Sequence, residues 1–241
     1  MLPLRDLNPT RRTPFITYAL IAINVLVFLW EQLYSVAELQ AIFLRLSVVP
    51  ASVVQNPFVL ETFLDLIRSM FLHGGWAHLL GNMLYLWLFG DNIEDRLGTI
   101  LYVTIYLVSG IAASIAQILI DPNSPIPLIG ASGAIAGVLG GYLILFPGVR
   151  VQGIIPLGRI SRLAEWPAWS VLGLWFVIQF LNGALSLGVE IGATGGVAFF
   201  AHVGGFIAGL ILTLIFAQLI TQPPAEDRRE VLYERARRYR Y

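Results

Sequence analysis

Residues 99–120 read TILYVTIYLVSGIAASIAQILI, an apolar stretch without a single charged side chain. A helix needs roughly 20 such residues to cross the hydrocarbon core of a bilayer. Segments of similar character recur along the 241-residue chain, which is 57% hydrophobic and only 12% charged. Because a soluble domain carries about 25% charged residues, we predict that lipid surrounds most of this chain.

Six apolar segments are expected to span the membrane, with bounds of about 15–34, 76–89, 99–120, 128–146, 167–187 and 196–220. Backbone polar groups in lipid must be paired within the protein, and these segments lack the alternating pattern of barrel strands. We therefore predict an all-α, polytopic six-helix bundle. The first segment is too long for a signal-peptide core and no cleavage site follows it, so we expect it to persist in the mature protein.

The predicted membrane domain at 15–220 is flanked by a short N-terminal segment at 1–14 and a basic tail at 221–241. Within the domain, the connection at 35–75 mixes apolar runs with scattered charge. This pattern predicts an amphipathic element in the outer interface. The connection at 188–196 is rich in glycine and is expected to be mobile, and the tail could form a short basic helix against anionic headgroups.

Arginine residues indicate how the helices are oriented. They cluster before the first segment, between the fourth and the fifth, and after the sixth, as in Arg5, Arg11, Arg12, Arg150, Arg159, Arg162, Arg228 and Arg240. Positive charge marks cytoplasmic loops, so we expect both termini in the cytoplasm. A six-helix chain without an added domain or transit peptide is typical of a prokaryotic plasma membrane, which predicts a multi-pass protein of the cell membrane.

Four polar side chains lie at a similar predicted depth: His78, Asn82, Ser132 and His202. In the expected topology, the second, fourth and sixth helices all run from the outside to the inside. Each of the four residues comes early in its helix, so all four fall in the outer leaflet. Polar groups inside a membrane are costly and usually functional, and we infer that these four share one site.

Small residues recur at every fourth position of the fourth and sixth segments: Gly133, Gly137 and Gly141, and Ala201, Gly205 and Gly209. Such faces let two membrane helices pack backbone to backbone. Packing these two helices would bring Ser132 towards His202, and a base beside a hydroxyl activates a nucleophile. Gly130 permits an unusual backbone angle before Ser132, whose amide at a helix start can donate to an oxyanion.

Other polar residues are interpreted as structural. Asn24, Gln117 and Gln179 would hold helices together, His73 would make a hydrogen bond in the outer connection, and Glu94 and Arg96 would fix the inner loop. The site residues also have simpler readings. A membrane serine commonly bonds a carbonyl of the preceding turn, and small residues four apart indicate packing rather than function.

Three motifs resemble those of rhomboid proteases: His73-Gly-Gly-Trp-Ala-His78-Leu-Leu-Gly-Asn82, Gly130-Ala-Ser132-Gly133, and Ala201-His202-Val-Gly-Gly205 followed by Gly209. The inner-loop segment from Asn92 to Gly98 is also similar, and the resemblance covers roughly residues 60–215. It implies an intramembrane serine endopeptidase with a Ser–His dyad and no third acidic member. Ser132 would be the nucleophile and His202 the base, and the Ser132 amide, His78 and Asn82 would hold the oxyanion.

The resemblance further implies a water-accessible cavity that opens to the outer side and substrates that are single-span membrane proteins. No cofactor and no metal are expected, the lipid bilayer is the surrounding partner, and nucleic acid is not a partner. The oligomeric state stays open. Two positions depart from the family pattern. Leu64-Asp65 stands where many members have Trp-Arg, and Ala136 stands where many have an aromatic residue that stacks on the base.

Other functions fit the sequence less well. A zinc protease needs His-Glu-x-x-His, which neither His73 nor His78 begins, and the aspartates of an aspartyl protease would have to lie within helices. The chain has no cysteine, so a cysteine nucleophile is excluded. A transporter should line a path across the membrane with polar groups. The remaining alternative is a non-catalytic rhomboid-like protein that binds membrane clients, although such proteins characteristically lose the serine or the histidine.

Overall fold

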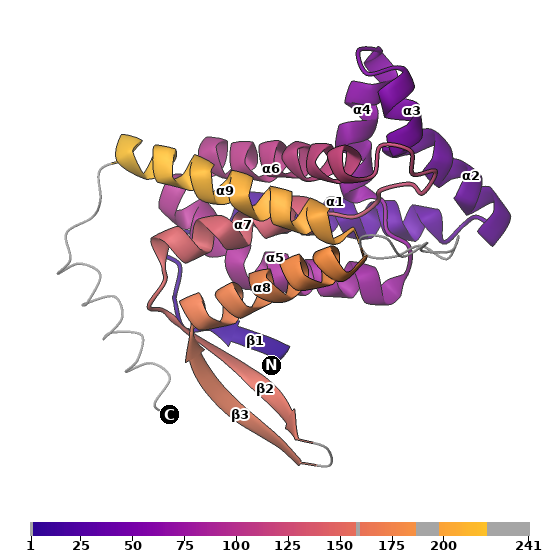
Figure 1. Ribbon diagram of the computed structural model, residues 1–241. Coiled ribbons are helices and arrows are strands. Elements are labelled where there is room, and N and C mark those ends of the chain that lie inside the picture. The colour runs from indigo at the N-terminus through magenta and orange to yellow at the C-terminus, as the bar shows by residue number, and fades with distance from the viewer. Residues whose placement is uncertain (1, 158–159, 187–197, 221–241) are drawn as a thin grey trace.

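The computed structural model describes residues 2–157, 160–186 and 198–220. Figure 1 shows a bundle of long helices, namely α1 (Phe15–Glu31), α5 (Trp76–Leu97), α6 (Thr99–Ile120), α7 (Ser132–Leu145), α8 (Ala168–Ser186) and α9 (Phe199–Leu219). Helices α6, α8 and α9 are long and apolar enough to cross a membrane, and α1 and α7 are shorter apolar helices. The prediction of a polytopic helical bundle is confirmed.

Two helices differ from their expected bounds for identifiable reasons. Helix α5 continues to Leu97, well past the expected end at residue 89, because Asn92 and Glu94 are buried and bonded to other elements. Helix α7 starts at Ser132 rather than at residue 128. Gly130 has a φ of +116°, which a right-handed helix cannot contain, so the preceding residues form an irregular approach to the helix.

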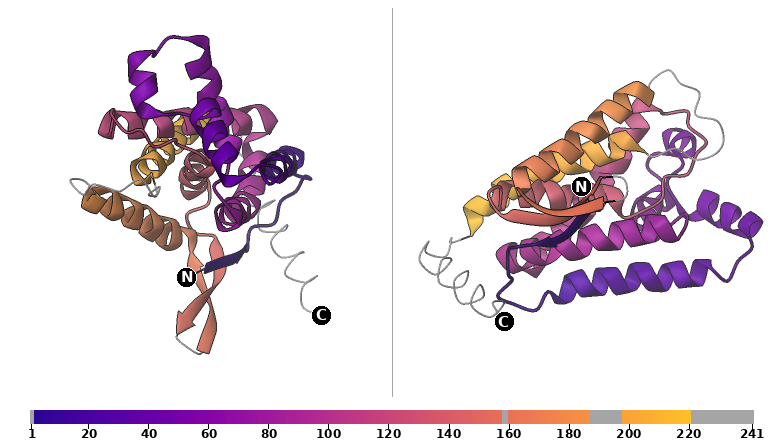
Figure 2. Two further views of the ribbon diagram at one scale, coloured as in Figure 1. Left: turned by 90° about the vertical axis from the view of Figure 1, so that its right-hand side faces the viewer. Right: turned by 90° about the horizontal axis from the view of Figure 1, so that it is seen from below.

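The connection at 35–75 folds into α2 (Val36–Leu46), α3 (Pro50–Gln55), α4 (Leu60–Arg68) and the 3-10 helix η1 (Ser69–Phe71). These short helices project at one end of the bundle (Figures 1 and 2). Helix α2 begins with a capping box, in which Ser35 and Glu38 bond each other's backbone amides. This connection therefore folds as short helices, and the prediction that it lies in the outer interface stays a prediction.

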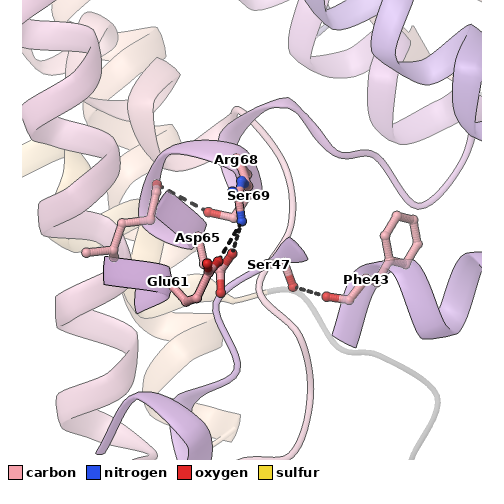
Figure 3. Close-up of polar contacts among 7 residues, drawn as sticks. Phe43, Ser47, Glu61, Asp65, Arg68 and Ser69 are labelled. Atoms are coloured by element: carbon pink, nitrogen blue, oxygen red, sulfur yellow. Dashed lines mark hydrogen bonds and ion pairs between the residues drawn. The ribbon is translucent and has the colours of Figure 1, made fainter. Parts of the chain in front are cut away.

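Arg68 ties α4 together three residues after Leu64-Asp65, the pair that departs from the family pattern (Figure 3). Its guanidinium donates to Glu61 at 3.1 Å and to Asp65 at 3.2 Å. Both bonds stay within one short helix, so they brace α4 itself. The outer region is joined to the bundle by backbone bonds instead, since the amide of Leu128 donates to the carbonyl of Val48 at 2.7 Å.

A three-stranded antiparallel sheet, which was not predicted from the sequence, projects from the bundle beneath α8 in Figure 1 and starts at the ends of α7 and α8 that lie away from α2–α4. Its order is β1 (Leu2–Asp6), β2 (Arg150–Leu157) and β3 (Ile160–Pro167). The N-terminal strand thus pairs with the connection between α7 and α8. Residues 2–6 and that connection therefore lie side by side.

Helix α7 lies in the centre of the core, and all residues from Gly133 to Tyr142 are buried. Its glycine face packs against α9 as predicted. A methyl group added at Gly205 would collide with the carbonyl oxygen of Gly133, and one added at Gly209 would collide with that of Gly137. The two backbones touch directly, which fixes the position of α9 along α7.

The N-terminal end of α1 is fixed by Glu94 of α5. Its carboxylate accepts hydrogen bonds from the amides of Ile16 at 2.9 Å and Thr17 at 2.8 Å, and from the Thr17 hydroxyl at 2.9 Å. These amides belong to the first turn of α1, where no intrahelical acceptor exists. A carboxylate there also complements the positive end of the helix dipole. Glu94 thus has a structural role, but it lies within α5 and holds the start of α1, whereas the sequence predicted that it would fix a loop.

Candidate active site

Ser132 and His202 meet where the N-terminal ends of α7 and α9 lie against each other. The Ser132 hydroxyl Oγ lies 2.8 Å from Nε2 of His202, although 70 positions separate the two residues in the chain. Both side chains are only partly buried. The contact follows from the glycine faces described above, because only backbone-to-backbone packing lets these short polar side chains reach each other.

The turn before Ser132 presents that residue at the very start of α7. Gly130 adopts its positive φ of +116°, and its amide donates to the carbonyl of Ser69 at 2.8 Å. Ser132 is the first residue of the helix, so its own amide is among the four that find no acceptor within a helix. The helix dipole adds partial positive charge at this end, and the Ser132 amide can therefore donate to an anion.

His78 and Asn82 lie one turn apart on α5 and face the same turn. A methyl group built on Gly130 would lie 2.6 Å from His78 Nε2 and 3.6 Å from Asn82 Nδ2. Two side-chain nitrogens therefore converge on the backbone that leads into Ser132. The structure brings together all four residues that the sequence predicted for one site.

His73 holds Asn82 in place, a contact that the sequence analysis did not foresee. Nδ1 of His73 lies 3.2 Å from the carbonyl oxygen of Phe71, and only a protonated nitrogen can donate to a carbonyl. Nε2 of His73 is then the acceptor for Asn82 Nδ2 at 3.0 Å. This bond uses one of the two amide hydrogens of Asn82 and leaves the other for a ligand. The His73 amide donates to the buried carboxylate of Glu31 at 3.0 Å.

Helix α8 supplies two further neighbours of His202. Gln179 Oε1 lies 2.8 Å from His202 Nδ1, and the Trp175 ring lies beside the imidazole with its centroid 5.8 Å away and its plane tilted by 32°. The prediction that Gln179 only holds two helices together was incomplete, because its hydrogen-bond partner is His202, the histidine of the site. Trp175 and Gln179 stand four residues apart, a spacing that places both on one helix face and that could have indicated a shared target.

A family model for the rhomboid domain matches residues 60–219. The chain belongs to the rhomboid family. The match spans every helix that contributes to the site, from the approach to α5 through the end of α9. In this rhomboid protein, the aromatic neighbour of His202 comes from α8, whereas Ala136 leaves the corresponding position on α7 without a ring.

Named relatives occur in plants, yeast and bacteria. RHOMBOID-like protein 4 of Arabidopsis thaliana is 35% identical over 150 residues, which cover 62% of this chain and 33% of that protein. Putative rhomboid protease YdcA of Bacillus subtilis is 38% identical over 153 residues, covering 64% and 67%. Rhomboid protease GluP of Bacillus subtilis is 45% identical over 78 residues, covering 32% and 15%. The chain spans 33% to 45% of the length of the first plant and yeast relatives.

Two expectations concern segments outside the described residues, namely the predicted mobility of the connection at 188–196 and the basic helix in the tail at 221–241. Among the described residues, no group of three or more histidine, cysteine, aspartate or glutamate side chains is arranged to hold a metal ion.

Proposed function

We propose that this rhomboid protein is an intramembrane serine endopeptidase in which Ser132 is the nucleophile and His202 the general base. The observation that carries the proposal is the 2.8 Å contact between Ser132 Oγ and His202 Nε2. A hydroxyl within hydrogen-bond reach of an imidazole can lose its proton as it attacks a carbonyl carbon. Two relatives named as rhomboid proteases support the same reaction class.

In the proposed reaction, the Ser132 oxygen bonds to the carbonyl carbon of a peptide while its proton passes to Nε2 of His202. The carbonyl oxygen becomes an oxyanion. The Ser132 amide, His78 and the free amide hydrogen of Asn82 are the groups arranged to receive it. His202 then returns the proton to the leaving amine as the C–N bond breaks. Water, activated by the same imidazole, cleaves the acyl ester and restores Ser132.

The proposed substrates are membrane proteins, and single-span proteins with a helix-destabilised segment are the specific class that we propose. A dyad at the outer ends of α7 and α9 would meet the part of a substrate that lies in the outer leaflet. A peptide bond must leave its helix to become accessible to Ser132, because helical carbonyls are enclosed by their own hydrogen bonds.

We further propose that the protein resides in the cell membrane with both termini in the cytoplasm. The pairing of β1 with β2 supports a common side for the N-terminus and the connection between α7 and α8. Some relatives carry the word mitochondrial in their names, so the membrane in which each family member works has to be established for that member.

The decisive test is covalent labelling of the purified, detergent-solubilised chain with a fluorescent fluorophosphonate. We expect wild type to be labelled and Ser132→Ala and His202→Ala to stay unlabelled. Ser114→Ala is the matched control, because Ser114 is a buried serine of α6 whose hydroxyl bonds a carbonyl of its own helix. Equal labelling of the Ser132→Ala variant, or no labelling of folded wild type, would contradict the proposal. The second result would favour a non-catalytic role in binding membrane clients.

A further inference from the structure

Gln179 occupies a place that the reaction described above does not use. Its Oε1 atom lies 2.8 Å from Nδ1 of His202, on the side of the imidazole opposite Ser132. An amide oxygen can only accept a hydrogen bond. The proton of the neutral imidazole is therefore on Nδ1, and the lone pair of Nε2 points at the Ser132 hydroxyl.

This proton position matters because a neutral histidine has two tautomers. The hydrogen bond at one ring nitrogen decides which tautomer is present. If Nε2 carried the proton, it would donate to Ser132 and could not remove a proton from it. The Gln179 contact therefore selects the one tautomer that can act as a base.

Trp175 restricts the same ring in a second way. It comes from α8, four residues before Gln179, and its ring lies beside His202 with a centroid separation of 5.8 Å. Trp175 also contacts Phe206 of α9 at 6.1 Å. One face of α8 thus provides both the acceptor for Nδ1 and an aromatic surface beside the imidazole, in a chain where Ala136 provides no ring.

We propose that Gln179 is a positioning residue that holds His202 in its reactive tautomer, so that the site is a Ser132–His202–Gln179 triad with a neutral third member. The inference rests on the proposed Ser132–His202 dyad and extends it. It also makes α8 part of the site, because the orientation of the base depends on that helix. Among the three helices that are long and apolar enough to cross a membrane, α8 has the smallest fraction of residues buried inside the protein, 17% against 33% for α6 and 28% for α9.

A neutral third member has a chemical consequence that a carboxylate would not share. The imidazole becomes positively charged when it takes the Ser132 proton, and a carboxylate at Nδ1 would stabilise that charge directly. The amide of Gln179 fixes the geometry and adds only a dipole. Gln179→Glu should therefore move the acidic limb of the pH–rate profile to higher pH. Gln179→Met should remove the hydrogen bond that orients the His202 imidazole.

The test uses the full chain in detergent and the rate constant of fluorophosphonate labelling at Ser132, measured from pH 5 to pH 9. We expect Gln179→Met to slow labelling by about 10- to 100-fold, by analogy with the loss of a hydrogen-bond partner that orients a metal-binding histidine. Gln179→Glu should retain labelling with the shifted acidic limb. Asn182→Leu is the control, because Asn182 is an exposed polar residue three positions further along α8.

A second readout does not depend on activity. The chain has three histidines, so selective ¹⁵N labelling of histidine should allow the tautomer of His202 to be read by NMR after assignment with His73 and His78 variants. We expect one tautomer in wild type and a mixture in Gln179→Met.

Unchanged labelling rates together with an unchanged tautomer in Gln179→Met would overturn the inference. If that variant fails to fold, a Gln179→Glu profile superimposable on wild type would overturn it instead. A wild type that is never labelled contradicts the proposed function, whereas the tautomer measurement still tests Gln179.

Discussion

Gly209 of α9 packs directly on the backbone of Gly137 in α7, with its α-carbon facing the carbonyl group of the partner helix. The contact lies one turn beyond a second such pair, Gly205 on Gly133. A methyl group at either position of α9 would collide with backbone atoms that cannot move aside alone. These contacts therefore allow helix α9 only one position along α7. In that position Ser132 lies next to His202.

Gly209→Ala should separate α7 from α9 and destabilise the protein. Overpacking of a close contact costs about 1–3 kcal/mol, and the displacement should also lengthen the Ser132–His202 contact and slow fluorophosphonate labelling. Thermal unfolding in detergent and the labelling rate measure both effects. Gly173→Ala is the matched control, because no atom lies within 4 Å of a methyl group added there. Equal stability of the two variants would contradict the packing argument.

Asn82→Ala should slow the reaction without unfolding the protein. One amide hydrogen of Asn82 is bound to His73, and the other is free to donate to the oxyanion. Loss of one such donor costs about 100- to 1000-fold in subtilisin, and under the proposed function a range of about 10- to 1000-fold is expected here. Single-turnover cleavage of a membrane peptide, compared with thermal stability, is the measurement. A variant with reduced stability and an unchanged rate would assign Asn82 to packing alone.

Asp6 should make the free energy of unfolding of the protein depend on pH. Its carboxylate accepts hydrogen bonds from Asn92 at 2.8 Å and Tyr142 at 2.9 Å. Burial and the charge of Asp91 raise the pKa of Asp6 from 3.8 to about 7, although Tyr142 and Arg5 act in the opposite direction. The folded state then binds a proton that the unfolded state has released between about pH 4 and 7, so stability falls as pH rises through this window.

Asp6→Asn removes this titration and keeps an oxygen acceptor for Asn92 and Tyr142. The unfolding temperature of wild type should drop more between pH 5 and pH 8 than that of the variant. Differential scanning fluorimetry in detergent at these two pH values is sufficient. Parallel curves for the two proteins would show that Asp6 does not titrate with folding.

The orientation of the chain can be mapped because it contains no cysteine. Gln55→Cys lies at the end of α3 in the outer region, and Glu165→Cys lies on β3 of the sheet; both side chains are exposed. A membrane-impermeant maleimide should label the first in intact cells and the second only after permeabilisation. The reverse pattern would invert the proposed topology.

Much of the helical architecture followed from the sequence because lipid imposes simple rules. Helix α6 begins at Thr99 and ends at Ile120, where its apolar run begins and ends. Ser132, His202, His78 and Asn82 were predicted to share a site because polar residues at one depth are rare in a membrane segment. These predictions needed only composition, spacing and orientation.

The parts that the sequence did not reveal depend on contacts between distant segments. The sheet was missed because β2 and β3 lie in a connection of mixed polar and apolar residues that also reads as a loop. Their partner β1 is also about 150 residues away in the sequence. The role of Gln179 was missed because a single glutamine in an apolar helix does not show which neighbour it faces. Rotation of α8 about its axis decides that, and it is set by packing rather than by hydropathy.

The pairing of β1 with β2 has a consequence for how the protein is made. Residues 2–6 leave the ribosome before the helices, and their hydrogen-bonding partners at 150–157 emerge only after α1, α5, α6 and α7 have been synthesised. The amino-terminal strand must therefore stay unpaired during the insertion of four long helices. Closure of the sheet is thus a late step of biogenesis, and a bulky fusion directly before β1 would interfere with assembly rather than with the Ser132–His202 contact.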